Sequence, residues 1–230
     1  MMLRVKFTKS GCLKFIGHLD VMRYFQKAMR RAHIDVAYST GFSPHQIMSF
    51  AAPLSIGLTS DGEYFDMEVH SVTGREDMKA RLNHVMAEGI TVTDIRLLPD
   101  HAKNAMASVA AAGYTVRIRE QYEQGVPLKE AMTRFTESEH AFYVKKTKKN
   151  EITLDLKEGV HELSYENGTV SMLIDTGSSS NLKPEVVMEM LYSYYGKQCG
   201  EFDFIIHRTE TYGRTDDGRF APLIEAGEVF

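Results

Sequence analysis

Three residues near the N-terminus could carry acid–base chemistry: His18, Asp20 and His45. A histidine titrates near neutral pH, and a neighbouring carboxylate can fix the tautomer of its ring. His18 or His45 could therefore serve as a general base or a phosphate ligand, with Asp20 orienting His18. A helix cap and a favourable helix-dipole interaction would account for His18 and Asp20 without any chemistry. These residues are too few to predict a metal site, so we expect no bound metal.

Four basic residues gather on one side of a helix predicted over residues 18–33: Arg23, Lys27, Arg30 and Arg31. At 100° per residue they span an arc of about 100°, and the apolar residues Phe25 and Met29 lie on the opposite side. Cations in this arrangement favour contact with a polyanion. Contacts to phosphates would position a nucleic acid without reading its sequence. A merely solvated helix face is the alternative.

The segment over residues 38–45 is rich in turn residues and could bind an anion beside a base. Gly41 can adopt positive φ, and the proline that follows Ser43 restricts that serine to extended geometry. Backbone N–H groups together with Ser39, Ser43 and His45 could form a concavity for an anion, into which Phe42 or Tyr38 could stack a base. Relief of backbone strain and burial of Phe42 are the structural alternative.

The elements that must position these residues follow one order in both halves of the chain. Apolar spacing predicts, in the first half, a strand at 3–7, a helix at 18–33, strands at 35–38 and 64–70, a helix at 75–88 and a strand at 90–98. In the second half it predicts a strand at 114–119, a helix that begins near residue 127, strands at 141–146, 151–156, 160–165 and 169–174, a helix at 184–195 and a strand at 202–208. Asn167-Gly168 favours a type I′ turn between two of these strands.

This order, βαββαβ, predicts an α+β fold of two tandem ferredoxin-like domains with antiparallel sheets. We expect the first domain over residues 1–100, the second over residues 113–212 and a C-terminal tail over residues 213–230. A polar and alanine-rich connector separates the domains. The second domain carries one extra hairpin, and the sequence leaves open which hairpin is the insertion.

The composition is that of a folded protein with polarised charge. The 230 residues carry a net charge of −4, yet the first 50 hold eight basic and only two acidic residues. A basic patch on an otherwise acidic protein can hold a polyanion such as nucleic acid. The two cysteines, Cys12 and Cys199, form no CxxC pair, so we expect no cysteine-built metal cluster. No signal peptide or membrane span is predicted, and we expect a cytoplasmic protein without membrane contact.

Several short motifs resemble one known family: Gly17-His18-Leu19-Asp20, Arg30-Arg31-Ala32, Ala37-Tyr38-Ser39, Gly41-Phe42-Ser43-Pro44-His45, Ser49-Phe50-Ala51 and Pro53-Leu54 with Gly57. Together they resemble the radical-SAM-linked domain of unknown function, most strongly over residues 3–98. The resemblance implies a radical SAM protein as partner, which would bring an iron–sulfur cluster and SAM. This chain has no CxxxCxxC motif, so we expect no cofactor on the chain itself. The resemblance implies no catalytic residues.

Three functional hypotheses follow from these observations. The leading one is an RNA-binding accessory protein that works with a radical SAM enzyme in tRNA or ribosomal RNA modification and is not an enzyme on its own. The second is a metal-independent endoribonuclease in which His18 or His45 removes the 2′-hydroxyl proton. The third is a protein-interaction module that docks on the radical SAM partner through the apolar segment at residues 47–56.

Overall fold

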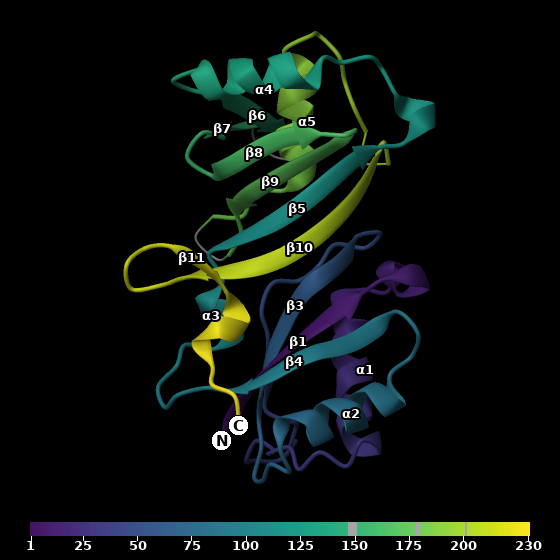
Figure 1. The fold of residues 1–230 in the computed structure, drawn as a ribbon, viewed down its shortest axis with the longest axis vertical. Helices are drawn as coiled ribbons and strands as arrows, with labels where there is room; N and C mark the ends of the chain where they lie inside the picture. Colours follow the sequence, from purple (N-terminus) through teal and green to yellow (C-terminus); the bar gives the residue numbers. More distant parts are fainter. Residues whose placement is uncertain (147–150, 178–179, 201) are drawn as a thin grey trace. The chain divides into compact units, whose positions relative to one another are not determined.

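The computed structural model describes residues 1–146, 151–177, 180–200 and 202–230 (Figure 1). The chain divides into two compact units. The first unit comprises Met1–Ala110 together with Arg208–Phe230, and the second comprises Ala111–His207. The expected domains at 1–100 and 113–212, with a tail at 213–230, stay a prediction.

The first unit is built around strand β1 (Met2–Lys9), which pairs antiparallel with β3 (Thr59–Glu68) and β4 (Ile90–Leu97). Its other elements are α1 (His18–Arg31), β2 (Met48–Phe50), α2 (Arg75–Val85), α3 (Ala105–Ser108), β11 (Phe220–Pro222) and the 3-10 turns Gly11–Phe15 and Leu223–Ala226. The strand predicted at residues 35–38 is wrong. Val36 and Tyr38 make only isolated bridges, and β2 is the strand that pairs with β3 before it in the chain.

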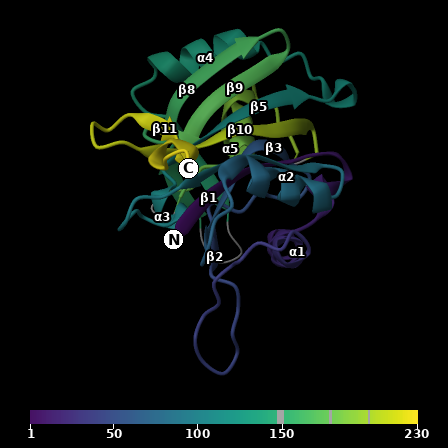
Figure 2. The same ribbon diagram turned by 60° about the horizontal axis from the view of Figure 1, so that its bottom comes forward.

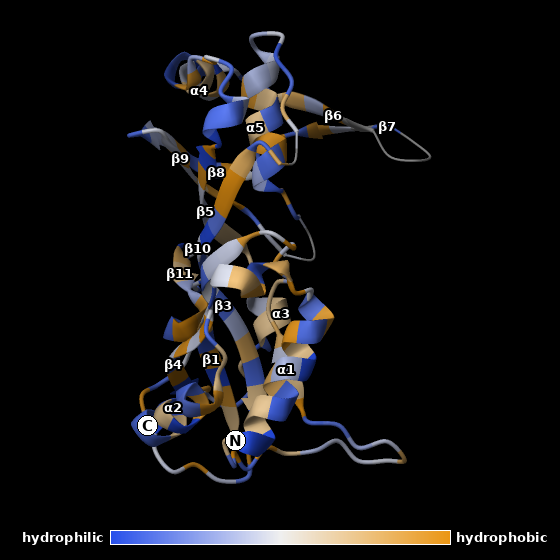
Figure 3. Ribbon diagram, turned by 90° about the vertical axis from the view of Figure 1, so that its right-hand side faces the viewer, coloured by the Kyte–Doolittle hydropathy of each residue, from blue (hydrophilic) through white to orange (hydrophobic). Residues whose placement is uncertain are grey.

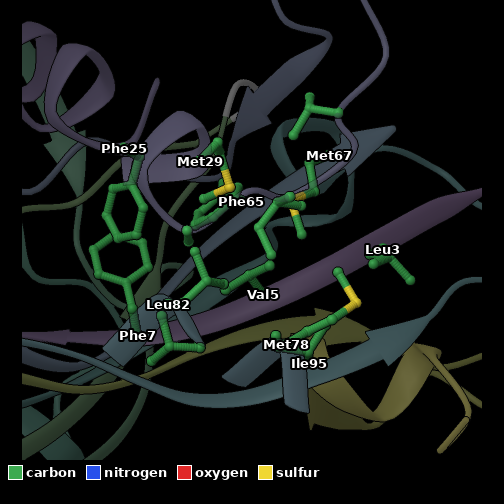
Figure 4. Packing of buried hydrophobic residues seen from close by; sticks show 14 of the residues in the cluster. Leu3, Val5, Phe7, Phe25, Met29, Phe65, Met67, Met78, Leu82 and Ile95 are labelled. Atoms are coloured by element: carbon green, nitrogen blue, oxygen red, sulfur yellow. The ribbon is translucent and has the colours of Figure 1, made fainter. Parts of the chain in front are cut away.

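Alternate residues of β1 point into the core of the first unit, as the strand period requires. Leu3, Val5 and Phe7 are almost completely buried there, against α1 and α2 (Figure 4). The ring of Phe7 lies 4.7 Å from that of Phe25 in an edge-on arrangement, and Phe25 lies 4.8 Å from Phe65. Such aromatic contacts add to the burial of apolar area. They fix α1 against the sheet.

The opposite face of β1 is also buried. The polar residues that alternate with apolar ones along this strand predict instead that one face is exposed to solvent. Arg4 is fully buried and forms a two-pronged ion pair with Asp66, with N–O distances of 2.8 and 2.9 Å. Its guanidinium also donates to the carbonyls of Leu223 and Lys103. The C-terminal segment and the residues just before α3 each supply one of the carbonyl acceptors that a buried arginine needs.

The second unit holds strands β5 (Ala111–Ile118), β8 (Val160–Glu166) and β9 (Thr169–Asp175), with β9 antiparallel to both of the others. Its helices are α4 (Leu128–Glu137) and α5 (Pro184–Ser193). Strands β6 (Phe142–Lys146) and β7 (Glu151–Asp155) pair antiparallel with each other in a separate two-stranded sheet. Strand β10 (Phe204–Arg214) begins in this unit and ends in the first.

Both halves thus form a mixed α/β structure whose sheets are mostly antiparallel. Two tandem ferredoxin-like domains are not confirmed by this arrangement. The turn at Asn167 and Gly168 has positive φ at both residues, 49° and 78°, which a type I′ hairpin requires. Among the described residues, no helix combines the length and apolar character that a membrane crossing needs.

Candidate functional site

Helix α1 presents a basic side to solvent. It starts after Gly17 and buries Val21, Phe25, Ala28 and Met29. Hydrophilic and hydrophobic residues alternate along α1 (Figure 3). Arg23, Lys27 and Arg30 are exposed, and we call these three residues the basic side of α1. Arg23 is paired only loosely with Asp20, at 3.6 Å, and both side chains are largely exposed. Exposed pairs of this kind contribute little to stability.

Arg31 differs from the other three cations of the predicted cluster. Its guanidinium donates to the backbone carbonyl of Val85 at 3.2 Å and lies 5.7 Å from the ring centre of Tyr24. These contacts hold Arg31 against the end of α2. The basic side of α1 therefore consists of three cations, and Arg31 has a structural role beside it.

Residues 38–46 form a projecting loop, which we call the aromatic loop. Figure 2 shows the segment between α1 and β2 extending away from the rest of the first unit. A backbone bridge between Tyr38 and Gln46 closes its base, and the hydroxyl of Ser39 accepts a hydrogen bond from the backbone N–H of His45 at 3.1 Å. Phe42 at its tip is fully exposed, at 112% of the reference area. The loop is thus ordered at its base and leaves an aromatic ring free at its tip.

Gln46 ties the aromatic loop to α1. Its side-chain N–H₂ donates to the carbonyl of Gln26 and to the hydroxyl of Tyr38, both at 3.2 Å. On an ideal helix Arg30 and Arg23 lie about 40° and 60° around the axis from Gln26. The base of the loop is therefore fixed on the flank of α1 next to the basic side. Tyr38, which is half exposed, lies at this junction.

The predicted acid–base residues do not meet in one place. His18 is the first residue of α1 and its ring packs edge-on against Phe50 at 5.6 Å, whereas His45 belongs to the aromatic loop. Nδ1 of His45 lies 2.9 Å from the hydroxyl of Ser39. In the described part of the chain, no hydrogen bond joins His18 to Asp20 or to His45, and Ser43 contacts His45 only through its carbonyl, at 3.5 Å.

A second group of ionisable residues surrounds His18. The sequence analysis did not connect these residues with His18. Lys9 at the end of β1, His18 and Glu63 of β3 line a small pocket whose other walls are mainly apolar, and we call it the lysine pocket. Nζ of Lys9 donates to the carbonyl of Ile16 at 3.0 Å. The carboxylate of Glu63 accepts a hydrogen bond from the guanidinium of Arg208, with 2.9 Å between Oε1 and Nη1.

Burial controls the ionisation of this pocket. Desolvation lowers the pKa of Lys9, an effect that Glu63 opposes and Arg208 reinforces. Desolvation also lowers the pKa of His18, again opposed by Glu63, while Lys9 lowers it further. Burial, with the carboxylate of Glu210 next in size, raises the pKa of Tyr64. The neutral forms of the amine, the imidazole and the phenol are all favoured.

A signal for this pocket is present in the sequence. Lys9 is in phase with the apolar residues Val5 and Phe7, and Glu63 is in phase with Phe65 and Met67. A charged residue at an apolar position of a strand predicts a buried charge with a special partner. As for metals, no three His, Cys, Asp or Glu side chains in the described ranges lie close enough together to hold an ion.

The fold and these features define an α/β protein with a basic helix beside a projecting aromatic loop. The chain belongs to the family described as "Uncharacterized protein conserved in bacteria (DUF2344)", whose model matches residues 2–184. Among solved structures, a chain of "Crystal Structure of a Cbf5-Nop10-Gar1 Complex" is similar, with 8% sequence identity and a TM-score of 0.49. The similarity covers 91% of this chain and 48% of that one, so this chain spans about half its length. The comparison with curated proteins gives no match.

Proposed function

We propose that this protein is an RNA-binding accessory protein that works with a radical SAM enzyme in tRNA or ribosomal RNA modification. The observation that carries the proposal is the junction at Gln46, which holds the aromatic loop on the flank of α1 next to its basic side. A strand of RNA needs both kinds of contact, cations for its phosphates and flat side chains for its bases.

The basic side of α1 is suited to phosphates. Lys27 and Arg30 are exposed and make no side-chain hydrogen bond or ion pair within the described residues, and Arg23 is held only by an exposed contact to Asp20. Binding a phosphate therefore requires no buried pair to be broken. Contacts of this kind fix position and release counterions, so they make binding depend on salt.

Phe42 and Tyr38 are suited to bases. A fully exposed phenylalanine at the tip of an ordered loop contributes nothing to the core. Stacking of a base on an aromatic side chain contributes about 1–3 kcal/mol and tolerates any sequence. The loop therefore supplies affinity without base-specific readout, as an accessory protein requires.

The chemistry itself would come from the partner. This chain has two cysteines, Cys12 and Cys199, which stand far apart in the sequence and cannot build an iron–sulfur cluster. In the proposal the cluster and SAM are bound by the radical SAM protein. Each half also contains the order βαββαβ, the second with one extra hairpin, which supports two ferredoxin-like halves as part of this proposal.

Binding of a fluorescein-labelled single-stranded RNA, followed by anisotropy at several salt concentrations, tests the proposal. The variant replaces Arg23, Lys27 and Arg30 by alanine. If each cation meets one phosphate, the slope of log K against log salt falls by about 2, at roughly 0.7 per single-strand phosphate.

The matched control replaces Lys129, Lys183 and Lys197, three exposed lysines of the second unit, by alanine. This control makes the same change in net charge. Its slope of log K against log salt should stay that of the unmodified protein. Identical slopes for all three proteins, or no RNA binding at low salt, would rule the proposal out.

A further inference from the structure

Three large apolar side chains are exposed at the N-terminal end of α1, and we call them the apolar patch: Phe15, Leu19 and Ile56. These residues are 64%, 65% and 61% exposed, whereas Leu13 and Ile16 pack against the core of the first unit. All five residues belong to that unit. Apolar residues exposed singly are ordinary, but a group of them marks a surface that binds a partner.

The two chain segments that carry the apolar patch meet at Gly17. A Cβ at Gly17 would lie 4.0 Å from Cδ1 of Ile56, so this side chain reaches the backbone between the other two residues of the patch. The backbone N–H of Gly57 donates to the carbonyl of Lys14 at 2.8 Å and ties the segments together. The patch is therefore formed before any partner binds, which lowers the entropic cost of binding.

The apolar patch continues the basic side of α1 toward the start of the helix. Leu19, Arg23 and Arg30 are exposed and follow one another at intervals of four and seven residues. On an ideal helix this spacing puts them within about 40° of one another around the axis, along a stripe roughly 16 Å long. A ligand held by the cations of α1 therefore lies next to the patch.

Positive charge borders the apolar patch on both sides. Arg23 follows it on α1, and Nζ of Lys14 lies 5.1 Å from the ring centre of Phe15. Asp20 is the only acidic residue in the sequence from residue 10 to residue 31. The charge of this surface is thus complementary to an anionic partner that also presents apolar faces.

An unpaired strand of RNA has this combination in every nucleotide. Its phosphates are negative, and its bases expose flat faces that stack on aromatic side chains. Phe15 offers such a face, with Lys14 beside it for a phosphate. In a duplex the bases are already stacked inside the helix, so their faces are not available to the patch.

We propose that the apolar patch is a second base-binding site, so that one unpaired strand of RNA runs along α1 from the aromatic loop to Phe15. The inference rests on the proposed function, because it extends the same RNA site and defines its substrate as single-stranded. At 3.4 Å per nucleotide in a stacked strand, the 16 Å from Arg30 to Leu19 correspond to no more than about five nucleotides. A strand of twelve nucleotides therefore reaches both ends of the helix.

The test measures the anisotropy of a fluorescein-labelled strand of twelve uridines with the full chain, and thermal unfolding on the same samples. Phe15→Ala should raise the Kd roughly 5- to 150-fold, the loss of one stacked base, without changing the slope of log K against log salt. Phe15→Tyr keeps the aromatic face and should restore most of the affinity. Phe202→Ala, which removes an exposed phenylalanine of the second unit, should leave the Kd unchanged.

Two other probes should be insensitive to Phe15→Ala. A strand of three uridines reaches only one end of α1 at a time, so its Kd should rise by no more than about twofold. A duplex of twelve base pairs contacts the cations alone, and its Kd should not change. Equal effects of Phe15→Ala on the long strand and on the duplex would overturn the inference.

Crosslinking of the unmodified protein gives a result that depends on no variant. A twelve-nucleotide strand with 4-thiouridine at every position should attach to the peptide that contains Phe15 as well as to the aromatic loop. Crosslinks confined to the aromatic loop, or an unchanged Kd for the twelve uridines in Phe15→Ala, would overturn the inference and leave the patch to a protein partner. The RNA proposal would survive that result as long as the cations of α1 still set the salt slope. No binding of the twelve uridines at low salt would overturn both.

Discussion

Phe42 is the residue at which the proposed RNA contact separates most cleanly from folding. Its side chain is fully exposed at the tip of the aromatic loop, and none of the ring contacts in the described structure involves it. The loop is held at its base by Gln46 and Ser39, both remote from the tip. Phe42→Ala should therefore leave the fold intact and act only on what the loop binds.

The expected size of the effect follows from this exposure. Surface substitutions without partners change stability by no more than about 0.5 kcal/mol. Loss of one stacked base costs about 1–3 kcal/mol, which corresponds to an increase in Kd of roughly 5- to 150-fold. Stacking is not screened by salt, so the slope of log K against log salt should stay that of the unmodified protein.

The assay is anisotropy of labelled single-stranded RNA, with thermal unfolding measured on the same samples. Phe42→Tyr keeps an aromatic face and should restore most of the affinity. Phe202→Ala removes an exposed phenylalanine of the second unit and should have no effect. An unchanged Kd for Phe42→Ala, or a fall in affinity that Phe42→Tyr does not reverse, would refute the stacking role.

Three further predictions concern stability. Asp66→Asn leaves the buried guanidinium of Arg4 without its counter-charge, so the free energy of unfolding in urea should fall by about 3–5 kcal/mol. An unchanged urea midpoint would contradict this account of the ion pair. Gly62→Ala would place a Cβ 2.5 Å from Cα of Glu210, so the free energy of unfolding measured by heating should fall by about 1–3 kcal/mol. An unchanged stability would mean that β3 and β10 do not approach so closely at this point. Desolvation lowers the pKa of His18, so below about pH 6.5 the unfolded chain takes up a proton at this position before the folded chain does. The free energy of unfolding should therefore fall as the pH drops below this value, and it should fall less in His18→Gln. Equal losses in the two proteins would count against a desolvated His18.

Local patterns predicted the elements that depend on near neighbours. The 3.6-residue spacing of Phe25 and Met29 gave the buried side of α1, which the structure confirms. Asn167 and Gly168 gave the turn between β8 and β9, because few other residues tolerate positive φ twice in succession. In these cases the sequence within a few residues determines the geometry.

Features that depend on distant residues could not be predicted in this way. Arg4 is buried because Leu223, 219 positions away, supplies one of its acceptors. Glu63 is held by Arg208, 145 positions away, and no local pattern specifies that partner. The burial of Lys9 could not be predicted for the same reason, since only the assembled first unit shows what covers it.

The candidate site was predictable in part. Arg23 and Lys27 lie exposed on α1, where the helical spacing put them. The alternatives for Phe42 were burial or exposure, and the sequence offered no means to choose; the structure exposes it completely. Whether His18 and His45 converge also depends on the path of the chain after α1, which carries His45 into the aromatic loop.

The measurement that tests the central claim most directly is sequencing of RNA crosslinked to this protein in cells. The unmodified protein is compared with the variant that replaces Arg23, Lys27 and Arg30 by alanine, and with the control that replaces Lys129, Lys183 and Lys197. The account predicts a defined tRNA or ribosomal RNA region that is enriched with the unmodified protein and the control and lost with the variant on α1. Equal recovery of RNA by all three proteins would contradict it.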